Sequence, residues 1–387
     1  MRFFYGVNAL KVKTLVYPEK FALKFFRASP ASKYKMCIKS VLVTGGAGYV
    51  GAVLVPKLLK KGYRVKVIDW YIFGDDVLEK NQKLVQIKGD LRDKKLVEKA
   101  LAGVDAVIHL ACISNDPSFE LDRKLGKSVN YDATVKLADM AARAGIKRFV
   151  YASSSSVYGV KKEPEVTEDL SLEPLTDYSK FKALCEEYLL GMTPKNSYLV
   201  ARSTSSPPRG ESTGQENKRM TILILRPATV CGYSPRLRLD LTVNILTINA
   251  LVNKKMIVFG GKQKRPNIHI EDMTDLYLKT LEYSDSKIAG KIYNAGYDNY
   301  TVMAIAQMVK RTLADRNIKI EVRPTNDNRS YHVSSKKIEH ELGFRAKHTV
   351  EEAIMDLKKA YEEGKIPNAI SDARYYNIKT MQKLAMK

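Results

Sequence analysis

The sequence has few cysteines and no long apolar run. Its four cysteines, Cys37, Cys112, Cys185 and Cys231, form no Cys-x-x-Cys pair and show no spacing to a histidine that suits a metal site. This usage favours reduced, mostly buried thiols in a cytoplasmic protein and predicts no bound metal. No stretch approaches the roughly 20 consecutive apolar residues that a membrane-spanning helix needs, so we expect no membrane span.

Acidic residues are scarce relative to basic ones. The 42 Asp and Glu residues against 65 Lys and Arg give a formal net charge of +23. Much of the excess lies in residues 1–36, 192–220 and 373–387, which carry +7, +3 and +4 and leave +9 on the rest. A moderately basic body suits an anionic substrate such as a nucleotide diphosphate. The spread of charge over appendages argues against a specific nucleic-acid site.

Three glycines follow the first strand-like run, residues 39–44, at positions Gly45, Gly48 and Gly51. Helical spacing of apolar residues then extends over 49–61. A strand that turns tightly into a helix presents free backbone N–H groups and the positive end of the helix dipole, which together can hold a pyrophosphate. Taken alone, the glycines also fit a plain tight turn.

A second predicted strand, residues 64–69, favours the pyrophosphate-binding interpretation because this strand ends in a carboxylate. Asp69 lies 18 residues after Gly51. A carboxylate at this point accepts the ribose hydroxyls of adenosine and repels a 2′-phosphate. The pattern therefore favours NAD over NADP.

Strands and helices alternate through the first half of the chain. Further strands are predicted at 83–87, 105–110, 147–153 and 221–225, and further helices at 132–144 and at 178–190 with Gly191 as its C-cap. Such alternation predicts an α/β fold in which helices cover both faces of a doubly wound parallel sheet.

The domain organisation is expected to have three parts. Residues 1–36 form a basic N-terminal extension, either a transit peptide or a segment ahead of a start at Met36, and we favour the second. Residues 37–230 form the dinucleotide-binding domain, with a mobile insertion at 192–220 that is rich in Ser, Pro and Gly. Residues 231–387 form mainly a smaller, discontinuous substrate domain, with about 266–300 returning to the core.

Candidate catalytic groups occur on one predicted helix and at one strand end. Tyr178 and Lys182 are four residues apart and so share a helix face. A nearby ammonium favours phenolate and suits the phenol to move a proton off a sugar hydroxyl. Serines 153–156 follow an apolar strand, where a hydroxyl can bind the reacting oxygen. Taken separately, the pair also fits a solvated helix face and the serines a polar turn.

Together these features resemble the extended short-chain dehydrogenase/reductases, specifically the NAD-dependent nucleotide-sugar epimerases and dehydratases of the UDP-glucose 4-epimerase type. The resemblance runs from about Lys39 to about Gly364, interrupted at 192–220. Its motifs are the segments 44–51, 89–93, 107–111, 225–230 and 265–272, together with Asn130, the serine strand and the Tyr178/Lys182 pair. It implies a Rossmann fold and a homodimer that pairs through two helices.

The resemblance also implies roles for individual residues. The cofactor contacts would be Gly45, Gly48, Tyr49 and Val50 at the pyrophosphate, Asp69 at the adenosine ribose, Asp90 and Leu91 at the adenine, and Leu110, Ala111 and Asn130 along the cofactor channel. The catalytic residues would be Tyr178 as general base and acid, Lys182 at the nicotinamide ribose, and Ser154 as the hydroxyl partner on the substrate. The substrate diphosphate would be held by Asn244, Arg265 and Arg329.

Several polar residues near these motifs have simpler interpretations. We expect His109 to be a hydrogen-bonded strand residue and Asp272 to cap or begin a helix. Asn130 can also bond a neighbouring strand. Arg236 and Arg238 fit solvated side chains, although Arg238 could reach a phosphate.

Departures from the family pattern separate the possible reactions. The 4,6-dehydratases carry an Asp-Glu pair where this chain has Ser155 and Ser156, and the glutamate of the decarboxylases is missing from this strand. Hydride transfer at C4 assisted by Tyr178 remains, which is sufficient for 4-epimerisation. Thr229 and Cys231 replace the family's Asn and aromatic residue and leave the sugar and the nucleotide open.

We therefore expect an NAD-dependent epimerase acting on a nucleotide-diphosphate sugar. The second hypothesis is a 4-keto-sugar reductase of the same fold. The third is a non-catalytic NAD-binding protein whose basic appendages bind RNA or a membrane. The expected location is cytoplasmic, with organellar targeting by residues 1–36 as the alternative.

Overall fold

The computed structural model describes residues 38–114, 116–193, 220–325 and 330–385. The predicted extension 1–36 and residues 194–219 of the predicted insertion lie outside these ranges.

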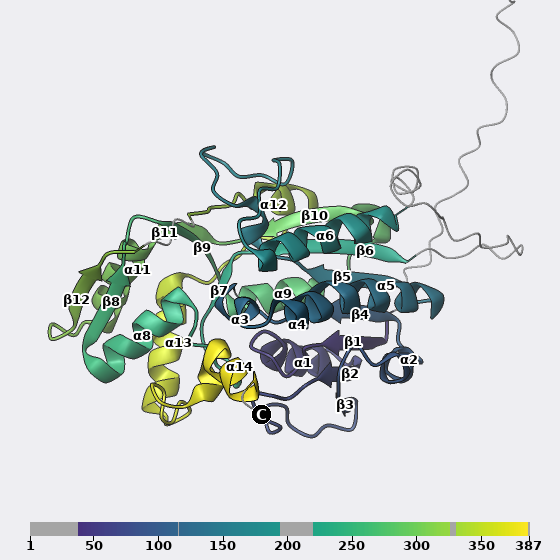
Figure 1. Cartoon of the computed structure of the whole chain (residues 1–387), viewed down its shortest axis with the longest axis horizontal. Coiled ribbons are helices and arrows are strands. Elements are labelled where there is room, and N and C mark those ends of the chain that lie inside the picture. The colour runs from purple at the N-terminus through teal and green to yellow at the C-terminus, as the bar shows by residue number, and fades with distance from the viewer. Residues whose placement is uncertain (1–37, 115, 194–219, 326–329, 386–387) are drawn as a thin grey trace, which may run out of the picture. The chain divides into compact units, whose positions relative to one another are not determined.

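A seven-stranded parallel sheet forms the centre of the described unit, in the order β10-β6-β5-β4-β1-β2-β3 (Figure 1). Its strands are β1 (Ser40–Thr44), β2 (Arg64–Asp69), β3 (Leu84–Lys88), β4 (Ala106–His109), β5 (Arg148–Ala152), β6 (Thr221–Pro227) and β10 (Lys291–Ala295). The chain winds outward from β1 to β3 and then returns to the other side of β1 with β4. The prediction of a doubly wound parallel sheet is confirmed.

Helices cover both faces of this sheet because successive strand residues are apolar on both sides. On one face, α1 (Gly51–Lys60), α9 (Ile270–Lys279) and α12 (Lys336–Leu342) pack with Val41 and Val43 of β1. On the other, α2 (Lys94–Leu101), α5 (Ala133–Arg143) and α6 (Asp177–Gly191) pack with Leu42. Shorter helices are α3 (Asp116–Glu120), α4 (Arg123–Lys127) and α10 (Asp285–Ile288).

The predicted strands and helices of this half begin and end within two residues of the observed ones. One detail was wrong. Gly191 is the last residue of α6, and the C-cap is Met192 in a right-handed helical conformation. Gly191 is absent from the glycines with positive φ, so this helix end does not use glycine's conformational freedom.

A smaller lobe is built mainly from later segments of the chain (Figure 1). Its three-stranded sheet contains β7 (Thr229–Cys231), β9 (Lys264–His269) and β11 (Asp298–Thr301), and its two-stranded sheet pairs β8 (Lys255–Phe259) with β12 (Lys319–Arg323). Apolar side chains of α8 (Thr242–Asn253), α11 (Val302–Leu313) and α13 (Val350–Glu362) form its core. The last helix is α14 (Asn377–Ala385).

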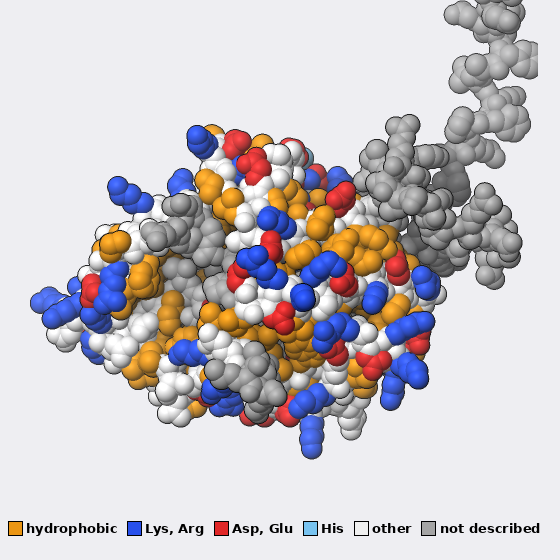
Figure 2. All heavy atoms as spheres, in the orientation of Figure 1, with side chains coloured by type: hydrophobic (Ala, Val, Ile, Leu, Met, Phe, Trp, Pro, Cys, Tyr) orange, Lys and Arg blue, Asp and Glu red, His pale blue; other side chains and the backbone are white. Residues whose placement is uncertain are grey.

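Charge is distributed rather than concentrated on the face in Figure 2, where lysine and arginine side chains alternate with acidic ones and with apolar areas. Within the described ranges, every helix is too short or too polar to cross a membrane.

Candidate functional site

A cavity of about 660 Å³ lies where the carboxyl ends of the central strands meet the smaller lobe. This edge is where open α/β sheets bind ligands. Most of the predicted site residues line it: Gly45, Gly48, Tyr49, Val50, Asp69, Asp90, Leu91, Leu110, Ala111, Ser154, Tyr178, Lys182 and Arg265. Asn130 and Asn244 are not among the lining residues, and Arg329 lies outside the described residues.

The turn of residues 45–51, which we call the phosphate-binding turn, requires its glycines. Gly45 has φ +71°, and a Cβ there would lie 2.7 Å from the backbone nitrogen of Ala111. A Cβ on Gly51 would lie 2.5 Å from the carbonyl oxygen of Gly46. Val50, the N-cap residue of α1, makes no side-chain capping bond. Val50 and Gly51 line the cavity, so the start of α1 can bind an anion there.

Asp69 ends β2 at the cavity, and two backbone groups fix its carboxylate. The N–H of Ala47 donates to Oδ2 at 3.0 Å, and the N–H of Tyr71 donates to Oδ1 at 2.9 Å. Burial raises the pKa of Asp69, and these two hydrogen bonds oppose the rise. Each oxygen can still accept a second hydrogen bond, as the two hydroxyls of a ribose require.

Two other predicted cofactor contacts differ in exposure. Asp90 lines the cavity and pairs with Arg92 at 2.6 Å. Partial burial favours a higher pKa for Asp90, but the hydrogen bonds from Arg92 outweigh burial and lower the pKa of Asp90. Asn130 is buried and bonds the backbone of Ile113 through both ends of its amide, at 2.8 and 3.0 Å. In this structure Asn130 shapes the chain after β4 rather than lining the cavity.

The three predicted catalytic side chains line the same cavity. The capping box at the start of α6 sets Tyr178 in its first turn. The Lys182 ammonium is buried, donates to the carbonyl oxygen of Ala152 at 2.7 Å and lies 5.9 Å from the Tyr178 ring centroid. Ser154 lies two residues after the end of β5 and caps the short 3-10 helix Ser155–Tyr158.

A buried ion pair that we did not predict from the sequence supports this edge. Arg226 on β6 and Glu186 on α6 lie 2.6 Å apart, with side chains only 3% and 2% exposed. Glu186 also accepts from the Ser153 hydroxyl, and Arg226 donates to the Tyr158 phenol at 2.7 Å. A charged residue at the end of an otherwise apolar strand is the signal that could have identified it.

The residues predicted to hold the substrate diphosphate are not all in one place. Arg265 lines the cavity beside the ring of Tyr331, 5.3 Å away. Asn244 is fully buried in α8, where its amide nitrogen donates to the carbonyl oxygen of Arg238 at 2.9 Å and to the Tyr49 phenol at 3.1 Å. The structure thus uses Asn244 to connect α8 to the phosphate-binding turn.

The simpler interpretation is confirmed for His109 and is wrong for Arg236 and for Arg238, whose side chain is only 13% exposed. His109 is buried and bonds the hydroxyls of Thr44 and Thr134 at 2.6 and 2.8 Å, as expected for a hydrogen-bonded strand residue. Arg236 is not solvated. It is 4% exposed, because its guanidinium lies over the Phe73 ring while it lines the cavity.

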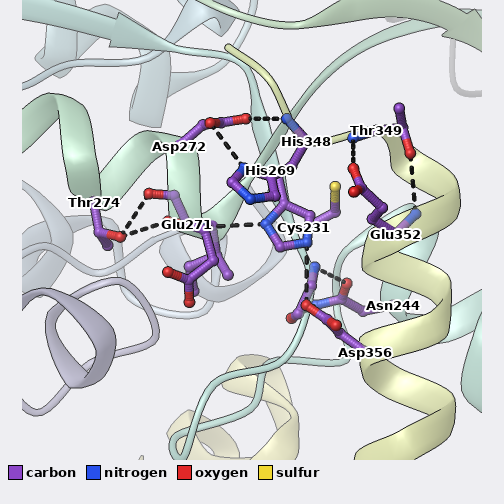
Figure 3. Close-up of polar contacts among 12 residues, drawn as sticks. Cys231, Asn244, His269, Glu271, Asp272, Thr274, His348, Thr349, Glu352 and Asp356 are labelled. Atoms are coloured by element: carbon purple, nitrogen blue, oxygen red, sulfur yellow. Dashed lines mark hydrogen bonds and ion pairs between the residues drawn. The ribbon is translucent and has the colours of Figure 1, made fainter.

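Asp272 belongs to a polar cluster with His269 and His348 (Figure 3). Residues 232–241, which we call the 232–241 connection, join β7 to α8 nearby in the sequence. The N-cap of α9 is His269, and Asp272 lies in the first turn of that helix. Its carboxylate accepts from the backbone N–H of Lys347 at 2.9 Å and bonds His348 Nδ1 at 2.9 Å. Asp272 therefore lies in the first turn of α9, where its carboxylate binds the 347–348 segment and does not cap the helix.

Comparison with known proteins places the chain. Residues 41–296 match the model of the NAD dependent epimerase/dehydratase family. UDP-glucose 4-epimerase 2 of Arabidopsis thaliana is 30% identical over 82% of this chain and 94% of its own length. UDP-arabinose 4-epimerase 1 of the same plant is 25% identical over 84% of this chain and 80% of its own.

A solved structure agrees in fold. The UDP-glucose 4-epimerase of Thermotoga maritima superposes with a TM-score of 0.71 over 84% of this chain and 99% of its own, at 21% identity. The family match covers both the phosphate-binding turn and the Tyr178/Lys182 pair. The chain belongs to the NAD dependent epimerase/dehydratase family, and its cofactor is NAD.

Proposed function

We propose that this protein is an NAD-dependent epimerase that inverts C4 of a nucleotide-diphosphate sugar through a transient 4-keto sugar. One observation carries the proposal: Ser154, Tyr178 and Lys182 line the same cavity as the phosphate-binding turn and Asp69. The similarity to plant proteins named as UDP-glucose and UDP-arabinose 4-epimerases supports both the reaction and the class of substrate.

The residues present fit the cofactor. The phosphate-binding turn packs so closely on Ala111 that no Cβ fits at Gly45, and Gly45 and Gly48 line the cavity. The carboxylate of Asp69, fixed by two backbone N–H groups, suits an unphosphorylated ribose. When bound, NAD⁺ supplies a hydride acceptor and then a hydride donor for the sugar carbon.

The remaining steps belong to the protein's own side chains. Tyr178 would remove the proton from the C4 hydroxyl as the carbonyl forms and return it when the opposite face is reduced. Lys182 stabilises negative charge on the phenol oxygen during this exchange. Ser154 would hydrogen-bond the reacting oxygen and hold it near Tyr178.

The cavity contains no acid and base pair suited to dehydration at the positions of Ser155 and Ser156, which both line it as hydroxyls. A 4-ketoreductase would use the same three catalytic residues, so it remains the second candidate. Thr229 lines the cavity, whereas Cys231 is buried against the carbonyl oxygen of Ile268. Of the two departures from the family pattern, Thr229 is therefore the one positioned to affect sugar choice.

The proposal includes a homodimer and a cytoplasmic location. The dimer would pair through two helices of each subunit, as the resemblance to the family implies.

The two leading functions differ in how they treat the cofactor. We expect the purified protein to release close to one equivalent of NAD⁺ on acid treatment and to interconvert a nucleotide sugar with its C4 epimer, without net redox change. A protein that purifies empty and consumes added NADH on a keto sugar would instead be a reductase. Sedimentation analysis of the same sample tests the dimer.

A further inference from the structure

The 232–241 connection is attached directly to the phosphate-binding turn. The Ser234 hydroxyl donates to the carbonyl oxygen of Tyr49 at 2.8 Å, and the Tyr49 phenol donates to the carbonyl oxygen of Gly232 at 2.7 Å. The Asn244 amide donates to the same phenol at 3.1 Å. These contacts are buried, so the connection keeps a fixed position relative to the turn.

Arg236 is carried by this connection and has an unusual environment. Its guanidinium lies 3.5 Å from the centroid of the Phe73 ring, and its Nη2 donates to Oδ1 of Asn377 at 2.5 Å. Its buried Nε has no hydrogen-bond partner within the described ranges. Asp240 and Asp69 attract the guanidinium but do not offset its burial. Burial, and then the neighbouring Arg238, lower the pKa of Arg236 to about 9.

A buried cation without a paired anion is destabilising unless an anion arrives. Arg236 lines the cavity, so a bound ligand can supply that anion. Two ligands of the proposed reaction carry a diphosphate: the dinucleotide and the sugar nucleotide. Asp69 ends β2 and Phe73 follows it, and Asp69, Phe73 and Arg236 all line the cavity. Because the guanidinium lies over the Phe73 ring, Arg236 is on the cofactor side.

We infer that Arg236 is a cofactor-binding residue that pairs with the phosphate bridge of the dinucleotide. The inference rests on the proposed function, in which the dinucleotide binds in this cavity. A planar guanidinium suits phosphate oxygens, and its free Nε–H is a remaining donor.

Asn377 is the positioning residue for Arg236. Besides accepting from Arg236, its side chain donates to Ser114 Oγ at 2.7 Å, and its backbone N–H donates to Asp240 Oδ2 at 2.7 Å. Ile378 and Met381 of the same helix line the cavity. The start of α14 thus forms part of the cavity wall beside Arg236, although it lies 141 residues later in the sequence.

The test compares cofactor binding in cofactor-stripped wild type, Arg236→Met and the control Arg374→Met, by calorimetry without substrate. Methionine keeps an apolar side chain over Phe73 but removes the charge. Arg374 is exposed, pairs with Asp372 and does not line the cavity. Arg374→Met therefore removes the same charge as Arg236→Met without changing the cavity. The ligands are NAD, ADP-ribose, which keeps the phosphate bridge, and adenosine, which lacks it.

We expect Arg236→Met to weaken NAD and ADP-ribose binding about 10- to 100-fold, the usual effect of a hydrogen bond to a charged group, and to leave adenosine binding and the control unchanged. Asn377→Ala should weaken NAD binding by a smaller factor, and Arg236→Lys should lie between wild type and Arg236→Met.

A second readout separates binding from a purely structural role. If Arg236 awaits an anion, the cofactor-free Arg236→Met protein melts no lower than wild type, while its stabilisation by NAD shrinks. A lower melting temperature or failure to fold would show that the residue is structural and overturn the inference. Unchanged NAD affinity with a raised KM for the sugar nucleotide would assign Arg236 to the substrate. Because binding is measured without turnover, a protein that binds NAD in this way but epimerises nothing would refute only the proposed function.

Discussion

The phosphate-binding turn and the catalytic edge around Tyr178 hold their ligands in different ways. The turn presents backbone, and its requirement is space: no Cβ fits at Gly45. The catalytic edge, formed by Ser154, Tyr178 and Lys182, presents side chains. The buried pair of Glu186 and Arg226 holds the neighbouring Ser153 and Tyr158 in place. The difference indicates that substitutions at the edge should separate catalysis from cofactor binding, whereas substitutions in the turn should affect both together.

The largest expected effect is at the edge. Tyr178→Phe removes the hydroxyl that exchanges the proton, so turnover should fall by about 10²- to 10⁴-fold, while retained NAD stays near one equivalent. Tyr188→Phe is the matched control, because Tyr188 lies on the same helix but bonds Asp139 and does not line the cavity. Turnover of Tyr178→Phe equal to that of the control would remove Tyr178 from the mechanism.

The buried pair behind the edge should matter for stability. Arg226→Met leaves the Glu186 carboxylate buried without its partner, and the free energy of unfolding should fall by about 3–5 kcal/mol. Denaturant unfolding measures this. The double variant Arg226→Met with Glu186→Leu should recover part of the loss, and a double variant less stable than the single one would show that the pair is not the source.

The turn can be tested with two glycines of similar conformation. Gly45 and Gly103 have φ of +71° and +69°, but a Cβ on Gly103 meets no atom within 4 Å. Gly103→Ala should cost only the left-handed strain of about 1–2 kcal/mol. Gly45→Ala adds a clash with the Ala111 backbone and should also lose NAD. Equal effects of the two on unfolding and on retained NAD would mean that close approach at Gly45 is unimportant.

The smallest effect concerns His109, next to the turn. Burial lowers the pKa of His109 to about 3 from an ordinary value of 6.5. Between these values the unfolded chain binds a proton that the folded protein does not. The free energy of unfolding therefore decreases as the pH is lowered, by about 2 kcal/mol at pH 5. In His109→Gln the loss of unfolding free energy between pH 8 and pH 5 should shrink by about this amount.

His348 provides a contrast of opposite sign. Partial burial lowers the pKa of His348, but the hydrogen bond to Asp272 outweighs burial, so the pKa is raised. The stabilisation that His348 contributes is therefore present below pH 6.5 and is lost as the pH rises through the raised value. His348→Gln should therefore enlarge the acid-induced loss. The same direction of change in both variants would contradict these assignments.

The sequence predicted what is local. The phosphate-binding turn, Asp69 and the Tyr178/Lys182 pair each depend on a short stretch of chain with a fixed period, so spacing alone indicates which side chains share a face. The contact between Arg236 and Asn377 joins residues 141 positions apart and has no such period. Asn244 shows the same limit, because its contact with Tyr49 spans 195 positions and depends on how α8 packs on the turn.

The central claim is that C4 is oxidised and reduced within one active site. The most direct measurement uses UDP-glucose and UDP-arabinose carrying deuterium at C4, with the products analysed by NMR and mass spectrometry. The account predicts a C4 epimer that keeps its deuterium at C4, with no net NADH formed. An epimer that has lost the label, a label moved to another carbon, or no epimer from either sugar would contradict it.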